Sequence, residues 1–218
     1  MKEPIVKLCG NRSLSDLSKT SSSKATHLGF IFVKRTKRYV RPEQVGRWLK
    51  EVRPGQKLVG VFVDPTISEI DEVLRFVPLD VIQLHGSETV GTLLSVKEAT
   101  GLPVWKVIHH QQDGEKQMEI FQGVADGYVI DSRVKGAHGG TGVRFDWEAI
   151  PGYKTMAADQ GVPFLIAGGV NPDNVGELLE FEPDGIDLSS GSETNEQKDI
   201  GKIQRIMKEV ERNVTSIS

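Results

Sequence analysis

The sequence has only one cysteine, Cys9, in 218 residues. A single thiol can form neither an internal disulfide nor a metal site of several cysteines, and such usage is typical of a reducing compartment. Long apolar runs are also missing. No segment approaches the roughly 18 apolar residues that span a membrane, and the first residues contain no stretch long enough for a signal peptide. We therefore expect a cytoplasmic protein.

The chain also lacks a block of like charge. Its 27 Lys and Arg residues nearly balance 30 Asp and Glu residues, which gives a formal net charge of −3. Proteins that bind nucleic acid or an anionic membrane surface usually carry a basic patch or a basic helix face. We expect no nucleic-acid partner and no membrane partner, so the ligand is predicted to be a small molecule.

Eight short apolar runs, rich in β-branched residues, predict β-strands at residues 5–10, 27–32, 57–63, 80–86, 104–110, 127–132, 163–169 and 185–191. Several segments between them have helical spacing of apolar residues, and Ser13, Pro42 and the segment 171–174 are predicted to lie at helix starts. Such strand–helix units predict one (β/α)8 barrel domain over residues 1–218. A doubly wound open sheet is the alternative, but it usually has a Gly-x-Gly-x-x-Gly first turn, which is absent here.

In such a barrel, reactive groups lie at the C-terminal ends of the strands and on the loops that follow. The sequence carries an unusually polar set at these predicted ends: Cys9, Asp64, His85, His110, Asp131, Gly168, Gly169, Ser189, Ser190 and Gly191. We expect the functional site to be drawn from this set.

Cys9 and Asp131 are the candidate reacting groups. Because side chains alternate along a strand, Lys7 and Cys9 share one face of the first strand, while the apolar Val6 and Leu8 share the other and are expected to face the helices. Lys7 and Cys9 are therefore predicted to point into the barrel. A lone cysteine is most often a small buried apolar residue, but a nearby ammonium group favours the thiolate, which can act as a base. The same alternation turns Asp131 inward, either as an ion-pair partner or as a general acid or base.

Two glycine-containing segments predict a phosphate site. Residues 166–175 join a strand to a helix through Gly168 and Gly169, and residues 188–193 follow the last strand. Glycines allow backbone N–H groups to approach an anion closely, and barrels commonly bind phosphate at the loops after strands seven and eight. Each segment alone is a weak signal, because two glycines usually form only a turn.

Three further features have a structural and a functional interpretation. The glycine-rich loop 135–147 is either a flexible loop or a lid over the substrate. The basic segment 34–42 is either solvated surface or the source of an arginine that binds a substrate carboxylate. The histidines His85, His109 and His110 are potential metal ligands, but adjacent residues of a strand point to opposite sides, so we expect no metal site.

Together these segments resemble phosphoribosylanthranilate isomerases of tryptophan biosynthesis. The resemblance extends over nearly the whole chain, in the motifs KLCG, LGFIF, KRYVRPE, GVFV, VIQLHG, VIDS, GGTGVRFDW, IAGGVNPDNV and DLSSGSE. It implies a (β/α)8 barrel that converts N-(5-phosphoribosyl)anthranilate to 1-(2-carboxyphenylamino)-1-deoxy-D-ribulose 5-phosphate, an Amadori rearrangement that needs no cofactor.

The resemblance also implies roles for individual residues. By motif, the general base falls on Cys9, the general acid on Asp131 and the arginine for the anthranilate carboxylate on Arg38. The phosphate site falls on Gly168, Gly169, Ser190 and Gly191. Further substrate contacts are expected from Lys7, Gln83, His85, Gly140, Gly142 and Asp187. Ser192 stands where an aliphatic residue is common, a departure that bears on the detailed phosphate geometry.

Two other functions suit a phosphate-binding barrel. A ribulose-phosphate epimerase resembles a metal-dependent site with His and Asp ligands, but the predicted strand 27–32 ends in no such ligand. A catalytically silent barrel that only binds a phosphorylated ligand is expected to have lost the acid or the base, and both Cys9 and Asp131 are present. The sequence leaves the choice between a monomer and a homodimer open.

Overall fold

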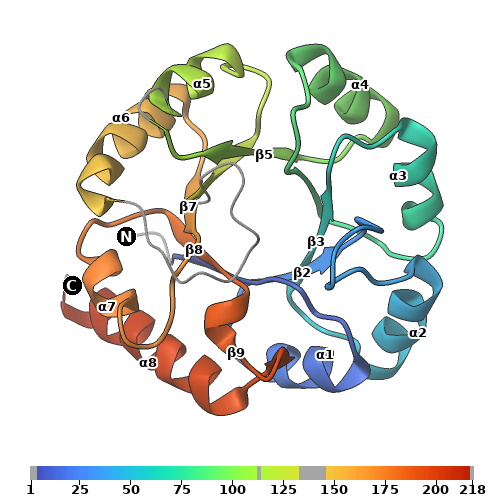
Figure 1. Ribbon diagram of the computed structural model, residues 1–218, viewed down its shortest axis with the longest axis horizontal. Coiled ribbons are helices and arrows are strands. Elements are labelled where there is room, and N and C mark those ends of the chain that lie inside the picture. The colour runs from blue at the N-terminus through green and yellow to red at the C-terminus, as the bar shows by residue number, and fades with distance from the viewer. Residues whose placement is uncertain (1–3, 112–113, 133–145, 217–218) are drawn as a thin grey trace.

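The computed structural model describes residues 4–111, 114–132 and 146–216. Eight parallel strands alternate with helices in chain order, and Figure 1 shows the helices as a ring around the strands. The strands are β1 (Ile5–Leu8), β2 (His27–Ile31), β3 (Lys57–Phe62), β4 (Val81–Leu84), β5 (Val104–His109), β6 (Gly127–Asp131), β7 (Phe164–Ala167) and β8 (Gly185–Leu188). The helices are α1 (Leu14–Ser21), α2 (Pro42–Val52), α3 (Ile67–Leu74), α4 (Val90–Thr100), α5 (Gly114–Ile120), α6 (Ile150–Gln160), α7 (Val175–Leu179) and α8 (Ile200–Ser216).

The sheet is closed, which confirms the predicted (β/α)8 barrel and excludes the open doubly wound sheet. Each strand pairs in parallel with the next one along the chain, and β1 pairs with β8 in the register Lys7 to Asp187. All eight predicted strands are present, although each ends one to three residues before the end of its apolar run. The extra residues of each run form the first part of the loop that follows.

The side-chain alternation predicted for β1 and β6 is confirmed. Val6, Leu8, Tyr128 and Ile130 belong to the large apolar cluster between strands and helices. A second, smaller cluster fills the barrel interior and is made of Val59, Val81, Trp105, Val107, Val129, Leu165 and Ala167, with Ile5 packed against it. Buried polar side chains also belong to these strands, among them Lys7, Gln83, Asp131 and Asp187. Apolar side chains therefore fill much of the barrel interior, and buried polar side chains are available for chemistry.

The predicted helix starts are confirmed. Ser13 is the N-cap of α1, and its hydroxyl accepts a hydrogen bond from the backbone N–H of Asp16 at 3.0 Å. Pro42 occupies the first turn of α2, where its missing N–H costs no helical hydrogen bond. The predicted start at residues 171–174 leads directly into α7, whose N-cap is Asn174, and the side-chain oxygen of Asn174 accepts from the backbone N–H of Asn171 at 2.8 Å.

The segment after β8 is more structured than the sequence predicts. A 3-10 turn at Ser190–Ser192 leads into a two-stranded antiparallel hairpin, β9 (Glu193–Thr194) and β10 (Gln197–Lys198). Its two turn residues, Asn195 and Glu196, both have positive φ, as a tight type I′ hairpin requires. Among the described residues, no helix is long and apolar enough to cross a membrane.

Candidate active site

Cys9 lies just beyond the end of β1, with Lys7 below it on the same interior face. The Lys7 side chain is fully buried, and its Nζ donates a hydrogen bond to Asp187 Oδ2 at 2.8 Å. Cys9 is buried too, and it packs so closely on β2 that a Cβ built on Gly29 would lie 2.8 Å from its Sγ. The glycine in β2 therefore makes room for the thiol.

Burial has the largest effect on the pKa of Cys9. Desolvation raises the pKa of the thiol, the charge of Lys7 lowers it, and the net pKa lies above the ordinary value. Lys7 thus acts in the predicted direction, but its effect is outweighed. Burial likewise acts to lower the pKa of Lys7, but the charge of Asp187, the charge of Cys9 when it ionises, and the hydrogen bonds to both groups together raise that pKa. Lys7 is held as the charged partner of Asp187, and Cys9 is held mainly as the neutral thiol.

Asp131 closes β6 on the interior side, where it contacts His85. Its side chain is almost completely buried, and its Oδ2 lies 3.2 Å from His85 Nε2. His85 comes from the loop that follows β4 and is partly exposed. A carboxyl group in this position can give or take a proton with a bound molecule and can exchange one with the imidazole.

The prediction that the histidines diverge is wrong for two of the three. His110 does turn away from the barrel, to the Tyr153 hydroxyl at 2.9 Å. His109 turns inward instead, and its ring centroid lies 5.4 Å from that of His85. One ligand atom each from His85, His109 and Asp131 lies within 4.8 Å of the other two. Alternation along one strand separates His109 from His110, but it places no limit on a histidine from the neighbouring strand. Two imidazoles and one carboxylate form a donor set that divalent transition metals accept.

The two predicted phosphate segments lie against each other. Gly168 and Gly169 both have positive φ, 82° and 72°, which an L side chain rarely adopts. A Cβ built on Gly191 would collide with the carbonyl oxygen of Val170, so the loops after β7 and β8 are in backbone contact there. Ser190 is exposed beside Gly191. A Cβ on Gly168 would collide with Ser132, so glycine is needed on the Asp131 side of the loop as well.

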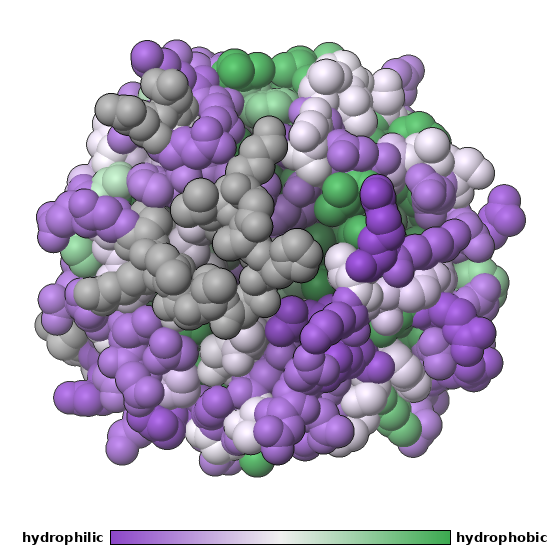
Figure 2. Space-filling model, viewed as in Figure 1, coloured by the Kyte–Doolittle hydropathy of each residue, from purple (hydrophilic) through white to green (hydrophobic). Residues whose placement is uncertain are grey.

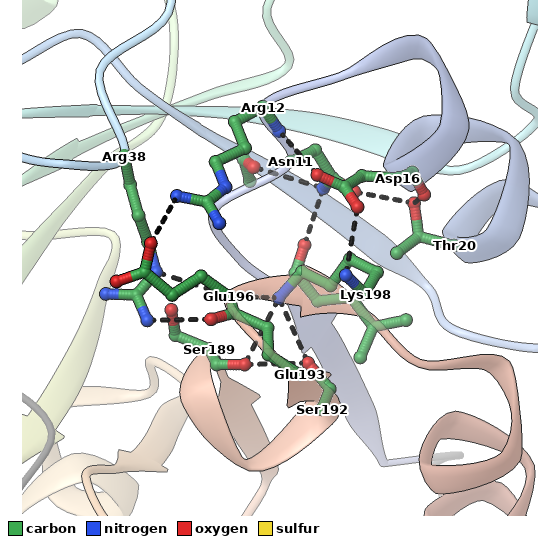
Figure 3. Close-up of polar contacts among 12 residues, drawn as sticks. Asn11, Arg12, Asp16, Thr20, Arg38, Ser189, Ser192, Glu193, Glu196 and Lys198 are labelled. Carbon is green, nitrogen blue, oxygen red and sulfur yellow. Dashed lines mark hydrogen bonds and ion pairs between the residues drawn. The ribbon is translucent and has the colours of Figure 1, made fainter.

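Arg38 is bound by a carboxylate that the sequence analysis did not identify. Its Nε donates to Glu193 Oε1 at 3.2 Å, and its Nη2 donates to Glu193 Oε2 at 2.8 Å. Figure 3 shows this bidentate pair beside Lys198, whose Nζ donates to the same Glu193 Oε1 at 3.0 Å. The stem of Arg38 passes over Gly10, where a Cβ would lie 2.8 Å from its Cδ. The arginine therefore reaches toward the position next to Cys9.

The other predicted residues differ in what the structure says of them. Gln83 and Asp187 are buried, and among the described residues Gln83 Oε1 and Asp187 Oδ1 have no hydrogen-bond partner. Gly140 and Gly142, with most of the predicted lid, lie outside the described residues. Ser192 is buried and turned toward the hairpin, because its hydroxyl donates to Ser189 O and accepts from Lys198.

A pocket lies between the segments that follow β2 and β3, and Arg35 lines it together with Phe32, Tyr39 and Phe62. Figure 2 shows a mainly hydrophilic face with hydrophobic side chains gathered in a hollow to the right of its centre. Arg35 is exposed, whereas Arg38 is three-quarters buried at 24% side-chain exposure. Of the two arginines, Arg38 is the one fixed beside the barrel mouth.

Comparison with known proteins identifies relatives over nearly the whole chain. Residues 6–209 match the family model described as N-(5'phosphoribosyl)anthranilate (PRA) isomerase. The chain is 54% identical over 202 residues to the N-(5'-phosphoribosyl)anthranilate isomerase of Geobacillus thermodenitrificans, covering 92% of this chain and 91% of that one. It is 45% identical to the protein of the same name from Bacillus subtilis, and all of both chains is covered. A crystal structure of phosphoribosyl anthranilate isomerase with reduced 1-(o-carboxyphenylamino)-1-deoxyribulose 5-phosphate is similar at a TM-score of 0.80 and 29% identity, covering 96% of this chain and 99% of that chain.

Proposed function

The chain belongs to the N-(5'-phosphoribosyl)anthranilate isomerase family, and on that basis we propose how its residues carry out the reaction. The protein is an enzyme of tryptophan biosynthesis that isomerises N-(5'-phosphoribosyl)anthranilate to 1-(2-carboxyphenylamino)-1-deoxyribulose 5-phosphate. The overall change is an Amadori rearrangement. It moves protons within one molecule and needs an acid to open the sugar ring and a base to remove a proton from carbon.

Asp131 is the general acid. In the first step its carboxylic proton goes to the ring oxygen of the ribose, the bond from this oxygen to C1 breaks, and the anthranilate nitrogen forms a double bond to C1. His85 lies 3.2 Å from the carboxyl group and is placed to return a proton to it between turnovers. The support for this assignment is the buried, inward position of Asp131 at the end of β6.

Cys9 is the general base. As a thiolate it removes the proton from C2, the electron pair forms the C1–C2 double bond of an enolamine, and the positive charge on nitrogen is neutralised. The enolamine then tautomerises to the aminoketone product. Because burial holds the resting thiol protonated, the thiolate is a minority form at neutral pH, and Lys7 is the fixed charge that favours it. Reaction therefore proceeds through a small ionised fraction of Cys9.

The two ends of the substrate are assigned to two different sets of groups at the mouth of the barrel. Gly168, Gly169, Ser190 and Gly191 bind the phosphate through backbone N–H groups and the serine hydroxyl. Arg38 binds the anthranilate carboxylate. Asp187 and Gln83 contribute buried acceptor atoms with no partner among the described residues, which suit the hydroxyl groups of the sugar.

One observation carries this proposal: Cys9 and Asp131 both project into the barrel interior at strand ends, each with its own charged or titratable neighbour. The test is turnover of N-(5'-phosphoribosyl)anthranilate by the purified protein and by the variants Cys9→Ser and Asp131→Asn. Full activity in either variant overturns the assignment of that residue.

The remaining expectations concern the whole molecule. We propose that residues 1–218 form one catalytic domain and that its partner is this phosphorylated sugar–anthranilate substrate, with no nucleic acid. We also propose that the enzyme works in the cytoplasm, where a lone thiol stays reduced.

A further inference from the structure

Glu193 uses only one edge of the Arg38 guanidinium. A guanidinium has five N–H groups, and the two hydrogen bonds to Glu193 engage Nε and one N–H of Nη2. Among the described residues no acceptor occupies the other three N–H groups, which lie on Nη1 and on the outer side of Nη2. These three form a second edge that can bind a planar carboxylate with two parallel hydrogen bonds. Arg38 can therefore keep Glu193 and bind a substrate carboxylate at the same time.

Glu193 by itself would weaken such a site, because Arg38 and Glu193 together carry no net charge. Lys198 changes this balance. Its side chain is fully buried, and its Nζ donates to Ser189 O at 3.2 Å, Ser192 Oγ at 3.0 Å and Glu193 Oε1 at 3.0 Å. Three acceptors match the three N–H groups of an ammonium ion. The set Arg38, Glu193 and Lys198 then has a net charge of +1 to present to an anion.

The lysine is also fixed in place through its backbone. Its backbone N–H donates to Asp16 Oδ1 at 2.9 Å (Figure 3). Its carbonyl oxygen accepts from Lys19 Nζ at 2.8 Å, so β10 is anchored on α1. Arg38 itself comes from the segment after β2, where the next residue, Tyr39, forms an isolated bridge to Ile31 of β2. A chain of hydrogen bonds thus connects α1 to Lys198, Lys198 to Glu193, and Glu193 to the guanidinium of Arg38.

We propose that Glu193 and Lys198 are positioning residues for the substrate carboxylate. Glu193 orients the Arg38 guanidinium with its second edge unoccupied, and Lys198 neutralises Glu193 so that the charge of Arg38 remains available. This inference rests on the proposed role of Arg38 in binding the anthranilate carboxylate. It predicts that loss of either residue weakens recognition of the carboxylate more than recognition of the sugar phosphate.

The test uses two probes, reduced 1-(o-carboxyphenylamino)-1-deoxyribulose 5-phosphate and the same compound without its carboxylate, with affinities measured by calorimetry on the full-length protein. The quantity of interest is the affinity for the probe with the carboxylate divided by the affinity for the probe without it. Glu193→Gln is expected to lower this ratio about tenfold, the size of one lost charge-assisted hydrogen bond, with the affinity of the second probe unchanged. In turnover, KM is expected to rise and kcat to stay within about twofold.

Lys198→Gln tests the charge argument, because it leaves Arg38 neutralised by Glu193. Its ratio is expected to fall at least as far as that of Glu193→Gln. The double variant Glu193→Gln/Lys198→Gln removes both charges together and is expected to recover part of the ratio lost in Lys198→Gln. Lys202→Gln is the matched control, since the Lys202 side chain donates to the backbone carbonyl of Glu193 and not to its carboxylate. It is expected to keep the wild-type ratio.

The outcomes separate this inference from the proposed function. If Arg38→Ala leaves the ratio unchanged, Arg38 is not the carboxylate ligand and that part of the proposed function fails. If Arg38→Ala lowers the ratio but Glu193→Gln weakens both probes equally, only the inference fails, because Glu193 then merely shapes the hairpin. The inference is supported if the double variant recovers part of the affinity ratio and Lys202→Gln keeps the wild-type ratio.

Discussion

Asp187 takes the short hydrogen bond of Lys7, at 2.8 Å, and so reduces the influence of this ammonium group on Cys9. Asp187 acts to raise the pKa of Cys9 while Lys7 acts to lower it, and burial adds to the raising side. The candidate base therefore rests in its protonated form, and its ionisation can be measured directly because the chain contains no other cysteine.

We predict that the Cys9 thiol titrates above the ordinary range for cysteine. In Lys7→Met the stabilising charge is lost, so the midpoint is expected to move to still higher pH. The ultraviolet absorbance of the thiolate, with Cys9→Ser as the blank, reports this single group. If chemistry limits turnover, the wild-type rate is expected to rise with pH below that midpoint, because the thiolate fraction rises. A midpoint below that of a free thiol would contradict the argument from burial.

Removing either reacting group is expected to cost at least about 10²-fold in kcat, the lower end of typical acid–base contributions. Asp131→Asn keeps the shape of the side chain but cannot donate a carboxylic proton. Cys9→Ser keeps the shape of the thiol but is a far poorer base near neutrality. Single-turnover rates are the appropriate measurement, since product release can mask a slower chemical step. Near-wild-type rates in Cys9→Ser would leave the cysteine with a packing role only.

Gly169→Val is expected to abolish phosphate binding at the loop after β7 while the barrel stays folded. The matched control is Gly161→Val at the C-terminus of α6, where φ is 70° against 72° at Gly169 and a Cβ would meet nothing within 4 Å. Both variants strain the backbone similarly, so they are expected to lose similar stability. Only Gly169→Val is expected to lose competition of inorganic phosphate with substrate. A Gly169→Val enzyme with normal KM would refute this location.

Chelation by EDTA is expected to leave kcat and KM unchanged, because the proposed steps are proton transfers between Asp131, Cys9 and the substrate. The convergence of His85, His109 and Asp131 makes this measurement informative. Activity that falls with EDTA and returns with a divalent ion would contradict the expectation, and it would identify these three residues as the place to look for the ion.

His27 is expected to destabilise the fold in acid. It starts β2 beside Trp105, with ring centroids 5.3 Å apart, and burial followed by the charges of Lys57 and Lys7 lowers its pKa to about 4. A folded-state pKa below the unfolded value favours folding when the histidine is neutral, so this contribution is complete above the unfolded pKa and is lost as the pH falls toward the folded one. The loss is about 2 to 3 kcal/mol at about pH 4.5. The free energy of unfolding, measured in urea, should fall by this additional amount between neutral pH and about pH 4.5 in the wild type compared with His27→Phe. The same pH dependence in both proteins would contradict this prediction.

Much of this site follows from local rules that a sequence reveals. The inward direction of Lys7, Cys9 and Asp131 depends only on the period of a strand, and the sequence predicts it correctly. Glu193 and Lys198 depend instead on a hairpin whose turn has two residues of positive φ, and on a bond from Lys198 to Asp16, 182 positions away. No local pattern encodes such a contact.

The convergence of His85 and His109 was missed for a related reason. Alternation within β5 correctly separates His109 from His110 but says nothing of the stagger between β4 and β5, which brings His109 beside His85. Register between strands is set by the closed barrel, so it can be read only from the three-dimensional structure.

The pairing of β1 with β8 also has a consequence for the order in which the chain acquires function. Lys7 meets Asp187, Asp16 meets Lys198 and Arg38 meets Glu193, so each of these contacts joins the beginning of the chain to its end. Such contacts of high sequence separation form late, because a long loop must close before they are gained. A chain on the ribosome that has emerged only as far as β7 already contains both Cys9 and Asp131, but it has no counter-ion for Lys7 and no support for Arg38. The chain can therefore recognise the substrate carboxylate only after β8 and the hairpin that follows it have been synthesised. A ligand that is bound by Arg38 then binds only to molecules whose barrel has closed.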